Sequence, residues 1–402
     1  MLFVAIAFWL SVILIVHVYL LYPVGIYLRA ALFSANHRRP SLDDHLPFLT
    51  VLIPAHNEER WIARKVENAL ALDYPRERIQ ILVASDGSTD GTVEIVRRYS
   101  EQGVELAHYL QRSGKTATLN RVVPTARGEI ILLTDANALL APDAARQLVL
   151  HFQDPAVGCV SGERICVHSG SPASEGEGLY WRYEAWIKTS ESRLGSCLGG
   201  TGQVMAVRKS LFPHIPVIGD DFYVPMKVLL ATSSRVLFEP KARAEIPAAA
   251  TLRLELERKI RSHVSLLRDM PHLAMGLNPL SNRVWWGFLS HHVLRLFVPF
   301  ALIAAFTLNL LLWRLGRFYQ FALLAQGLAY LAAALGLILA RRQIRLRPFY
   351  VPFYFLFANF AVLLAWVRWL RGRHQYAWQR TDRVLPPLEP AKERARLGSQ
   401  TS

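Results

Sequence analysis

Cysteine is scarce in this sequence, which has 402 residues and only Cys159, Cys166 and Cys197. No two of them form a Cys-x-x-Cys pair, and no cluster of histidines accompanies them. This pattern argues against a structural zinc site and against a disulfide framework. We interpret the three thiols as small core residues of a protein from a reducing compartment.

Two glycine-rich nucleotide-binding signatures are also missing. The turn after the first predicted strand, residues 54–58, reads PAHNE and lacks the glycines of a dinucleotide fingerprint. Residues 113–116, SGKT, resemble the end of a Walker A loop. Tyr109 stands where the first glycine of that loop belongs, and Lys115 opens a predicted helix in a different context. We therefore reject both signatures.

Acidic residues are outnumbered, because 31 Asp and Glu face 46 Lys and Arg, for a net charge of +15. Hydrophobic residues make up 52% of the chain and charged residues 19%, which excludes intrinsic disorder. A basic chain of this kind binds nucleic acid or lies in a membrane. Since many arginines stand at the ends of long apolar runs, we expect membrane lipids as partners and no nucleic acid.

Four apolar runs are long enough to cross a bilayer as helices, and they cover residues 2–22, 291–313, 318–340 and 349–370. The first run lacks the basic start and the cleavage site of a signal peptide. The arginines that follow it place the next domain inside by the positive-inside rule. The side of the arginine-rich tail stays open, because three further crossings place it outside whereas its charge places it inside.

These features divide the chain into five parts. We expect an N-terminal transmembrane helix and flank, a soluble α/β domain, an amphipathic interface helix, a transmembrane region of about three segments and a basic tail. The boundaries are 1–33, 40–278, 279–292, 293–370 and 371–402.

The soluble domain alternates buried strands with helices. Strands are predicted over 49–53, 79–83, 104–108 and 129–133, with helices over 58–72, 92–100 and 116–125. This order predicts an α/β fold with a mainly parallel sheet and helices on both faces. Ligands bind beyond the carboxyl ends of such strands, where the polar clusters 54–58, 85–90 and 134–137 lie. Each cluster alone also fits a plain turn with helix-capping residues.

Two pairs of oxygen-bearing side chains suit the transfer of a sugar from a nucleotide diphosphate. Asp135 and Asn137, just past a strand, offer oxygen ligands for a divalent cation, although an amide binds it less strongly than a second carboxylate. Asp220 and Asp221 are adjacent carboxylates, one of which would have a raised pKa suited to accepting a proton. The alternatives are a helix-capping loop for the first pair and a plain helix N-terminus for the second.

A basic cluster, residues 257–261 (ERKIR), precedes the interface helix. It would neutralise a departing diphosphate. It is equally typical of a juxtamembrane patch that contacts lipid head groups.

The motifs together resemble a family 2 glycosyltransferase with the GT-A fold. The resemblance is to the membrane-bound processive synthases of cellulose, hyaluronan, chitin and poly-N-acetylglucosamine. It rests on the order of these strings: VLIPAHNEE, ASDGSTDGT, GKTATLN, TDAN, YWRYE, GGTGQVMAVRKSLF, GDDFYVPMKV, ERKIR and WQRTDR.

The resemblance implies a role for each site residue. The nucleotide pocket would contain Pro54, Ala55, His56, Glu58, Asp86 at the uracil, Lys115 near the phosphates, Arg258 and Arg261. Asp135 and Asn137 would bind the metal, and Asp221 would be the base, with Asp220 beside it. The acceptor would contact Trp181, Gly200, Thr201, Gly202 and Gln203. Ser262 replaces the tryptophan of the processive motif, so Trp181 and Trp186 are candidates for stacking on a sugar.

By the same resemblance, the enzyme would be an inverting transferase with a UDP-sugar donor and Mg²⁺ or Mn²⁺. The acceptor would be a growing β-linked glycan; addition of one sugar to a lipid is the alternative. The implied location is the bacterial inner membrane, with the catalytic domain in the cytoplasm. Four apolar runs make a narrow channel, which an oligomer or a partner subunit would widen.

Overall fold

The computed structural model describes residues 1–33, 46–167, 172–216 and 219–372, apart from single positions 233, 250, 281, 343 and 345. For residues 172–177 only the backbone is described. The arginine-rich tail, whose side of the membrane the sequence left open, and its WQRTDR motif lie outside the described residues.

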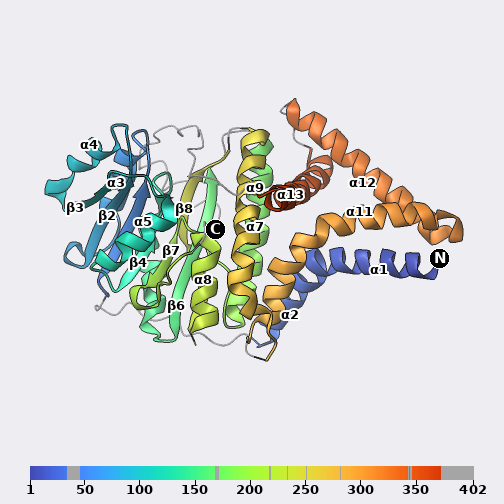
Figure 1. The fold of residues 1–402 in the computed structure, drawn as a ribbon, viewed down its shortest axis with the longest axis horizontal. Helices are drawn as coiled ribbons and strands as arrows, with labels where there is room; N and C mark the ends of the chain where they lie inside the picture. Colours follow the sequence, from blue (N-terminus) through green and yellow to red (C-terminus); the bar gives the residue numbers. More distant parts are fainter. Residues whose placement is uncertain are drawn as a thin grey trace.

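One eight-stranded sheet forms the centre of the soluble domain, with the strand order β3-β2-β1-β4-β7-β6-β8-β5 (Figure 1). The strands are β1 Leu49–Ala55, β2 Ile79–Asp86, β3 Val104–Tyr109, β4 Ile130–Leu133, β5 Leu139–Leu140, β6 Val157–Val167, β7 Met205–Arg208 and β8 Arg235–Pro247. Every residue of β1 is buried, as expected for a central strand covered on both faces.

The first four strands pair in parallel, with Leu49 opposite both Ile79 and Ile130. The connecting helices are α3 Ile62–Leu70, α4 Thr92–Arg97 and α5 Lys115–Val122. This half confirms the predicted α/β class and the βαβ order. The carboxyl ends of β1, β2 and β4 consequently meet at one edge of the sheet, which brings the three predicted polar clusters together.

The other half of the sheet is mixed. Strand β7 runs antiparallel to both β4 and β6, β6 and β8 are parallel, and β5 is antiparallel to β8. Helices α6 Ala144–Val149 and α8 Asp220–Ala231 belong to this half. Strand β7 runs from Met205, beside Leu133, to Arg208, beside Ile130, so it leaves the edge at which β4 ends. Helix α8 nevertheless begins near that edge, since Lys115 Nζ lies 2.8 Å from Asp135, just past β4, and 2.9 Å from Asp220 at the start of α8.

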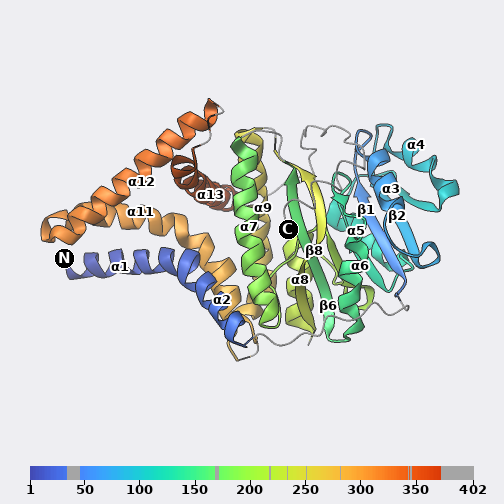
Figure 2. The same ribbon diagram turned by 180° about the vertical axis from the view of Figure 1, so that it is seen from behind.

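Two long helices, α7 Pro172–Arg193 and α9 Leu252–Asp269, lie between the sheet and the apolar helices (Figures 1 and 2). Four stretches are long and apolar enough to span a membrane: 2–33, 285–315, 317–341 and 347–370. They comprise α1 Leu2–Val16, η1 His17–Leu21, α2 Tyr22–Phe33, α10 Trp285–Gly287, η8 Phe288–Val293, α11 Leu294–Leu312, α12 Arg317–Arg341 and α13 Arg347–Leu370. The amphipathic helix predicted over 279–292 begins only at Trp285 and continues into the second stretch without a break, so among the described residues it is the start of that stretch and not a separate element.

Gly162 lies at an irregularity in the pairing of β6 with β8. A Cβ atom added there would lie 2.2 Å from the Ala242 carbonyl oxygen and 2.7 Å from Val204 Cγ2. A backbone carbonyl in a sheet has little room to move, so Gly162 allows this pairing.

We expect Gly162→Ala to lower the free energy of unfolding by about 1–3 kcal/mol through overpacking. Gly91→Ala is the matched control, because its nearest neighbouring atom, Glu59 Oε2, would lie 3.6 Å from the new Cβ. Thermal unfolding in detergent, followed by tryptophan fluorescence, measures both. Equal melting temperatures for the two variants would contradict this account of the β6–β8 contact.

Candidate active site

The nucleotide edge of the site is formed by the ends of β1 and β2. Pro54 and Ala55 are buried in β1, and His56 Nδ1 lies 2.6 Å from the Asp86 carbonyl oxygen. The Asp86 carboxylate is fully buried. It accepts hydrogen bonds from the Ser113 amide at 2.7 Å, the Ser113 hydroxyl at 3.0 Å and the Gly114 amide at 2.7 Å. Asp86 therefore fixes the loop before α5; contact with a uracil base stays a prediction.

Lys115 begins α5 and bridges two carboxylates. Its Nζ lies 2.8 Å from Asp135 Oδ1, just past β4, and 2.9 Å from Asp220 Oδ2, at the start of α8. Burial alone would lower the pKa of Lys115, but Asp135 and Asp220 raise it well above its ordinary value. Gln203 Nε2 donates to the other Asp135 oxygen at 2.8 Å. Four segments far apart in the sequence are thus joined in one polar cluster.

Asp221 lies beside this cluster. Burial, followed by the like charge of Asp220, raises the pKa of Asp221 to about 7. Gly202 packs so closely that an added Cβ would lie 1.9 Å from Asp221 Oδ1, and the Gly200 amide donates to the Asp221 carbonyl at 2.9 Å. A carboxylate that exchanges its proton near neutral pH is suited to general-base chemistry.

The residues near Asp135 fit a divalent cation. Asn137 Oδ1 is buried and has no hydrogen-bond partner among the described residues. Asn137 lies two residues past Asp135. The carboxylate oxygens of Asp135 and the amide oxygen of Asn137 are hard ligands of the kind that such a cation prefers. Within the described part of the chain, no three His, Cys, Asp or Glu side chains form a complete metal site. A cation here would take its other ligands from a diphosphate or water.

A cavity of about 470 Å³ extends from this cluster toward the membrane helices. Most predicted site residues line it: His56, Glu58, Asp135, Asn137, Trp181, Gly200, Thr201, Gln203, Asp221, Arg258 and Arg261. The other predicted residues, Pro54, Ala55, Asp86, Lys115, Gly202 and Asp220, are not among its lining residues. Sequence reasoning missed further lining residues, notably Arg164, Glu184, Lys188, His291, His292 and Arg295. Of these, Glu184 ends the YWRYE string, and His291, His292 and Arg295 are polar residues at the start of the apolar run 291–313.

The two candidate tryptophans differ in position. Trp181 lines the cavity, with the Arg164 guanidinium 4.9 Å from its ring centre. Trp186 packs against Tyr27 of the first membrane helix and Tyr183, with ring centres 5.5 and 6.2 Å apart. Trp186 therefore belongs to the packing between α7 and the first candidate membrane span.

The basic cluster on α9 is anchored by a buried carboxylate. Glu255 Oε2 lies 2.7 Å from Arg258 Nη2, and Oε1 lies 3.6 Å from Lys259 Nζ. Tyr354 of α13 donates to Oε1 at 3.2 Å. Arg258, Lys259 and Arg261 all line the cavity. Membrane helix α13 and Glu255 thus help to fix the cations that face the cavity.

Residues 50–215 match the model of the family "Glycosyl transferase family 2". This is the family that the motifs resemble, and the fold is the GT-A fold expected from them. It is similar in structure to the mannosyltransferase PcManGT of Pyrobaculum calidifontis, solved in complex with GDP-Man and Mn²⁺. The TM-score is 0.70 and the identity 25%, covering 91% of this chain and 99% of the other.

Two relatives that are similar in sequence carry names with different products. Beta-monoglucosyldiacylglycerol synthase of Nostoc sp. is 29% identical over 187 residues, which is 44% of this chain and 40% of the relative. Poly-beta-1,6-N-acetyl-D-glucosamine synthase of Staphylococcus aureus is 27% identical over 250 residues, 59% of this chain and 60% of the relative. The matched regions thus span about half the length of these relatives. The chain is similar to both a lipid glycosyltransferase and a polysaccharide synthase.

We expect Lys115→Met to destabilise the protein more at about pH 8 than at about pH 6, because it leaves Asp135, Asp220 and Asp221 facing one another without their cation. Repulsion raises the pKa values of these carboxyls in the folded state, so the cost grows as pH rises and they ionise. We expect the loss of melting temperature in Lys115→Met to be about 3 °C larger at the higher pH than at the lower pH. Millimolar Mn²⁺ should restore part of the lost melting temperature.

The control is Lys241→Met, because Lys241 is exposed on β8. It should change the melting temperature little at either pH. A loss in Lys115→Met that is equal at both pH values and insensitive to Mn²⁺ would contradict the bridging role of Lys115.

Proposed function

We propose that the protein is a membrane-bound inverting glycosyltransferase that moves a sugar from a UDP-sugar to an acceptor hydroxyl. The observation that carries the proposal is Asp221. Its pKa is raised to about 7, and it lies on the cavity that also contains Asp135 and the loop from Gly199 to Gln203. A base of this kind removes the proton of a hydroxyl at neutral pH.

The chemistry follows from these positions. Asp221 takes the proton of the acceptor hydroxyl. The oxygen of that hydroxyl attacks the anomeric carbon from the face opposite the nucleotide. The bond from that carbon to the diphosphate breaks, and the nucleotide diphosphate leaves with the electron pair. Arg258 and Arg261 stabilise the developing negative charge. Asp135 and Asn137 would hold Mg²⁺ or Mn²⁺, which supplies further positive charge to the diphosphate.

The acceptor is proposed to be a growing β-linked glycan, with single addition to a lipid as the second candidate. One observation favours the lipid. The cavity is lined by His292, Arg295 and Leu296, which belong to the second candidate membrane span. An acceptor in the membrane would therefore reach the site directly. In either case we propose a multi-pass protein of the bacterial inner membrane whose catalytic domain is cytoplasmic, as the basic flanks of its spans suggest.

Asp221→Asn should reduce transfer by about a hundredfold or more, because the amide cannot accept the proton. Binding of UDP should survive. In the wild type, kcat should fall as pH drops below about 7, since protonated Asp221 is not a base. Asp220→Asn removes a like charge, so it should move this acid limb to lower pH. Release of UDP and transfer of labelled sugar, measured against pH, test these expectations.

Near-normal turnover in Asp221→Asn would remove Asp221 as the base. Faster turnover with GDP-sugars than with UDP-sugars would correct the donor and leave the chemistry intact.

The size of the product separates the two acceptors. Membranes containing the protein, incubated with labelled UDP-glucose or UDP-N-acetylglucosamine, should give a high-mass product if the chain extends a glycan. The Asp221→Asn variant is the matched blank. A single product that partitions into organic solvent would establish the lipid acceptor instead.

A further inference from the structure

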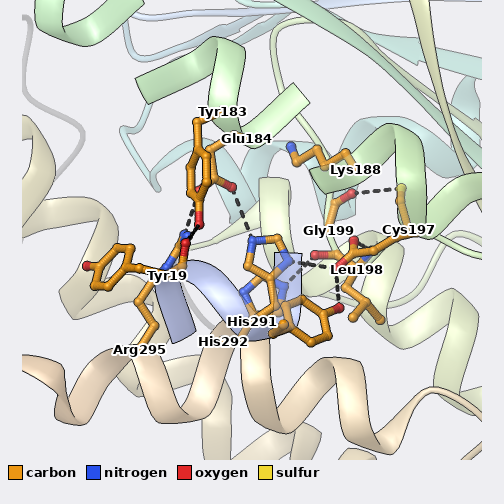
Figure 3. A network of polar contacts seen from close by, with 12 residues as sticks. Tyr19, Tyr183, Glu184, Lys188, Cys197, Leu198, Gly199, His291, His292 and Arg295 are labelled. Carbon is orange, nitrogen blue, oxygen red and sulfur yellow. Dashed lines mark hydrogen bonds and ion pairs between the residues drawn. The ribbon is translucent and has the colours of Figure 1, made fainter. Parts of the chain in front are cut away.

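Both backbone polar groups of Leu198 are bound by side chains. Glu191 of α7 accepts from the Leu198 amide at 3.0 Å. His292 Nε2 lies 2.5 Å from the Leu198 carbonyl oxygen (Figure 3). A carbonyl only accepts, so Nε2 is the donor and carries the proton. Leu198 is 2% exposed, so water cannot replace these bonds freely. We call these three residues the Leu198 clamp.

The Leu198 clamp leads directly into residues 199–203, which we call the acceptor loop. Gly199 follows with φ of +121°. The Gly200 amide donates to the Asp221 carbonyl at 2.9 Å, and Gly202 leaves room only for a hydrogen against the Asp221 carboxylate. A shift of Leu198 is therefore passed along four residues to the backbone and the carboxylate of Asp221.

A second contact joins the same histidine to α8. The His292 ring lies 4.6 Å, centre to centre, from the ring of Phe222, which directly follows Asp221. Phe288, which lies in η8 together with His292, stacks on Phe222 with 6.4 Å between the ring centres. The beginning of the second membrane span thus contacts the Asp221 region both through the loop and through a side chain.

A buried polar network holds the two side chains of the Leu198 clamp in place. Glu191 Oε1 accepts from the Tyr22 hydroxyl at 2.7 Å and lies 2.8 Å from His291 Nδ1. The other nitrogen of His291 lies 3.2 Å from Glu184, which also pairs with Arg295 at 2.5 Å. Burial alone would raise the pKa of Glu184, but Arg295 and His291 hold it well below its usual range. Two membrane spans and α7 are therefore tied together here.

We propose that Glu191 and His292 are positioning residues of the transfer reaction: through the backbone of Leu198 they set the acceptor loop against Asp221. The inference rests on the proposed function. It assigns to the start of a membrane helix a task in the chemistry as well as in anchoring. A displacement of about 1 Å at a reacting group costs on the order of a hundredfold in rate, so a clamp on the loop has measurable weight.

His292→Phe keeps a ring against Phe222 and removes the donor to Leu198, whereas His292→Gln restores an N–H donor. In the full-length protein in detergent, we expect His292→Phe to lower kcat about tenfold or more with the donor KM within about twofold. His292→Gln should recover most of this loss. The kcat of Glu191→Gln should lie between those of the wild type and His292→Phe. His272→Phe, at an exposed histidine, is the control and should behave as wild type.

Hydrogen–deuterium exchange provides a readout that needs no activity. Amides of residues 198–203 should exchange about tenfold faster or more in His292→Phe, while those of β1 and β2 stay as in wild type. Unchanged exchange of residues 198–203 would overturn the inference. Two kinetic results would also overturn it. One is a loss of kcat in His292→Phe that His292→Gln does not relieve, and the other is a rise in the donor KM as large as the fall in kcat. A wild-type protein without transfer activity would instead refute the proposed function, and the exchange result would still decide the Leu198 clamp.

Discussion

Three carboxylates lie close together at the edge of the sheet, and much of the surrounding structure serves to hold them there. Asp220 is buried and Asp135 is partly exposed to the cavity, so water screens the repulsion among Asp135, Asp220 and Asp221 only in part. Lys115 lies between the first two and offsets part of this repulsion. Lys115 is in turn placed by the loop that Asp86 binds through Ser113 and Gly114. The position of one lysine thus depends on a carboxylate that is not among the residues lining the cavity.

Sequence reasoning found the elements whose evidence is local. Strands β1 to β4 are short apolar runs between turn residues, so their order, their parallel pairing and the polar edge could be predicted. The antiparallel insertion of β7 between β4 and β6 could not, because strand pairing across the sheet depends on contacts far apart in sequence. For the same reason the hydrogen bonds of Asp86 to Ser113 and Gly114 become visible only in the structure, while its contact with a uracil base stays a prediction.

The histidines at the start of the second span are a sharper case. His291 and His292 stand out in the sequence as polar residues near an apolar run, with no sign of their partners. Glu191 lies 100 residues before His291, and Leu198 lies 94 residues before His292. No periodicity relates such positions. The partners become visible only once α7 packs beside the membrane helices.

Ionisable groups beside a membrane span are retained when something compensates for their burial. Here Glu184 and Glu191 face Arg295 and His291 across the boundary between the two parts of the chain. Each nitrogen of His291 faces one of these carboxyls, and Arg295 places a permanent positive charge beside Glu184. Separating the soluble domain from its spans would expose two unpaired acids on α7 and remove the donor to Leu198. The helices that could span a membrane are therefore part of the framework that holds Leu198 and the loop after it, so the shape of the candidate site depends on both parts of the chain.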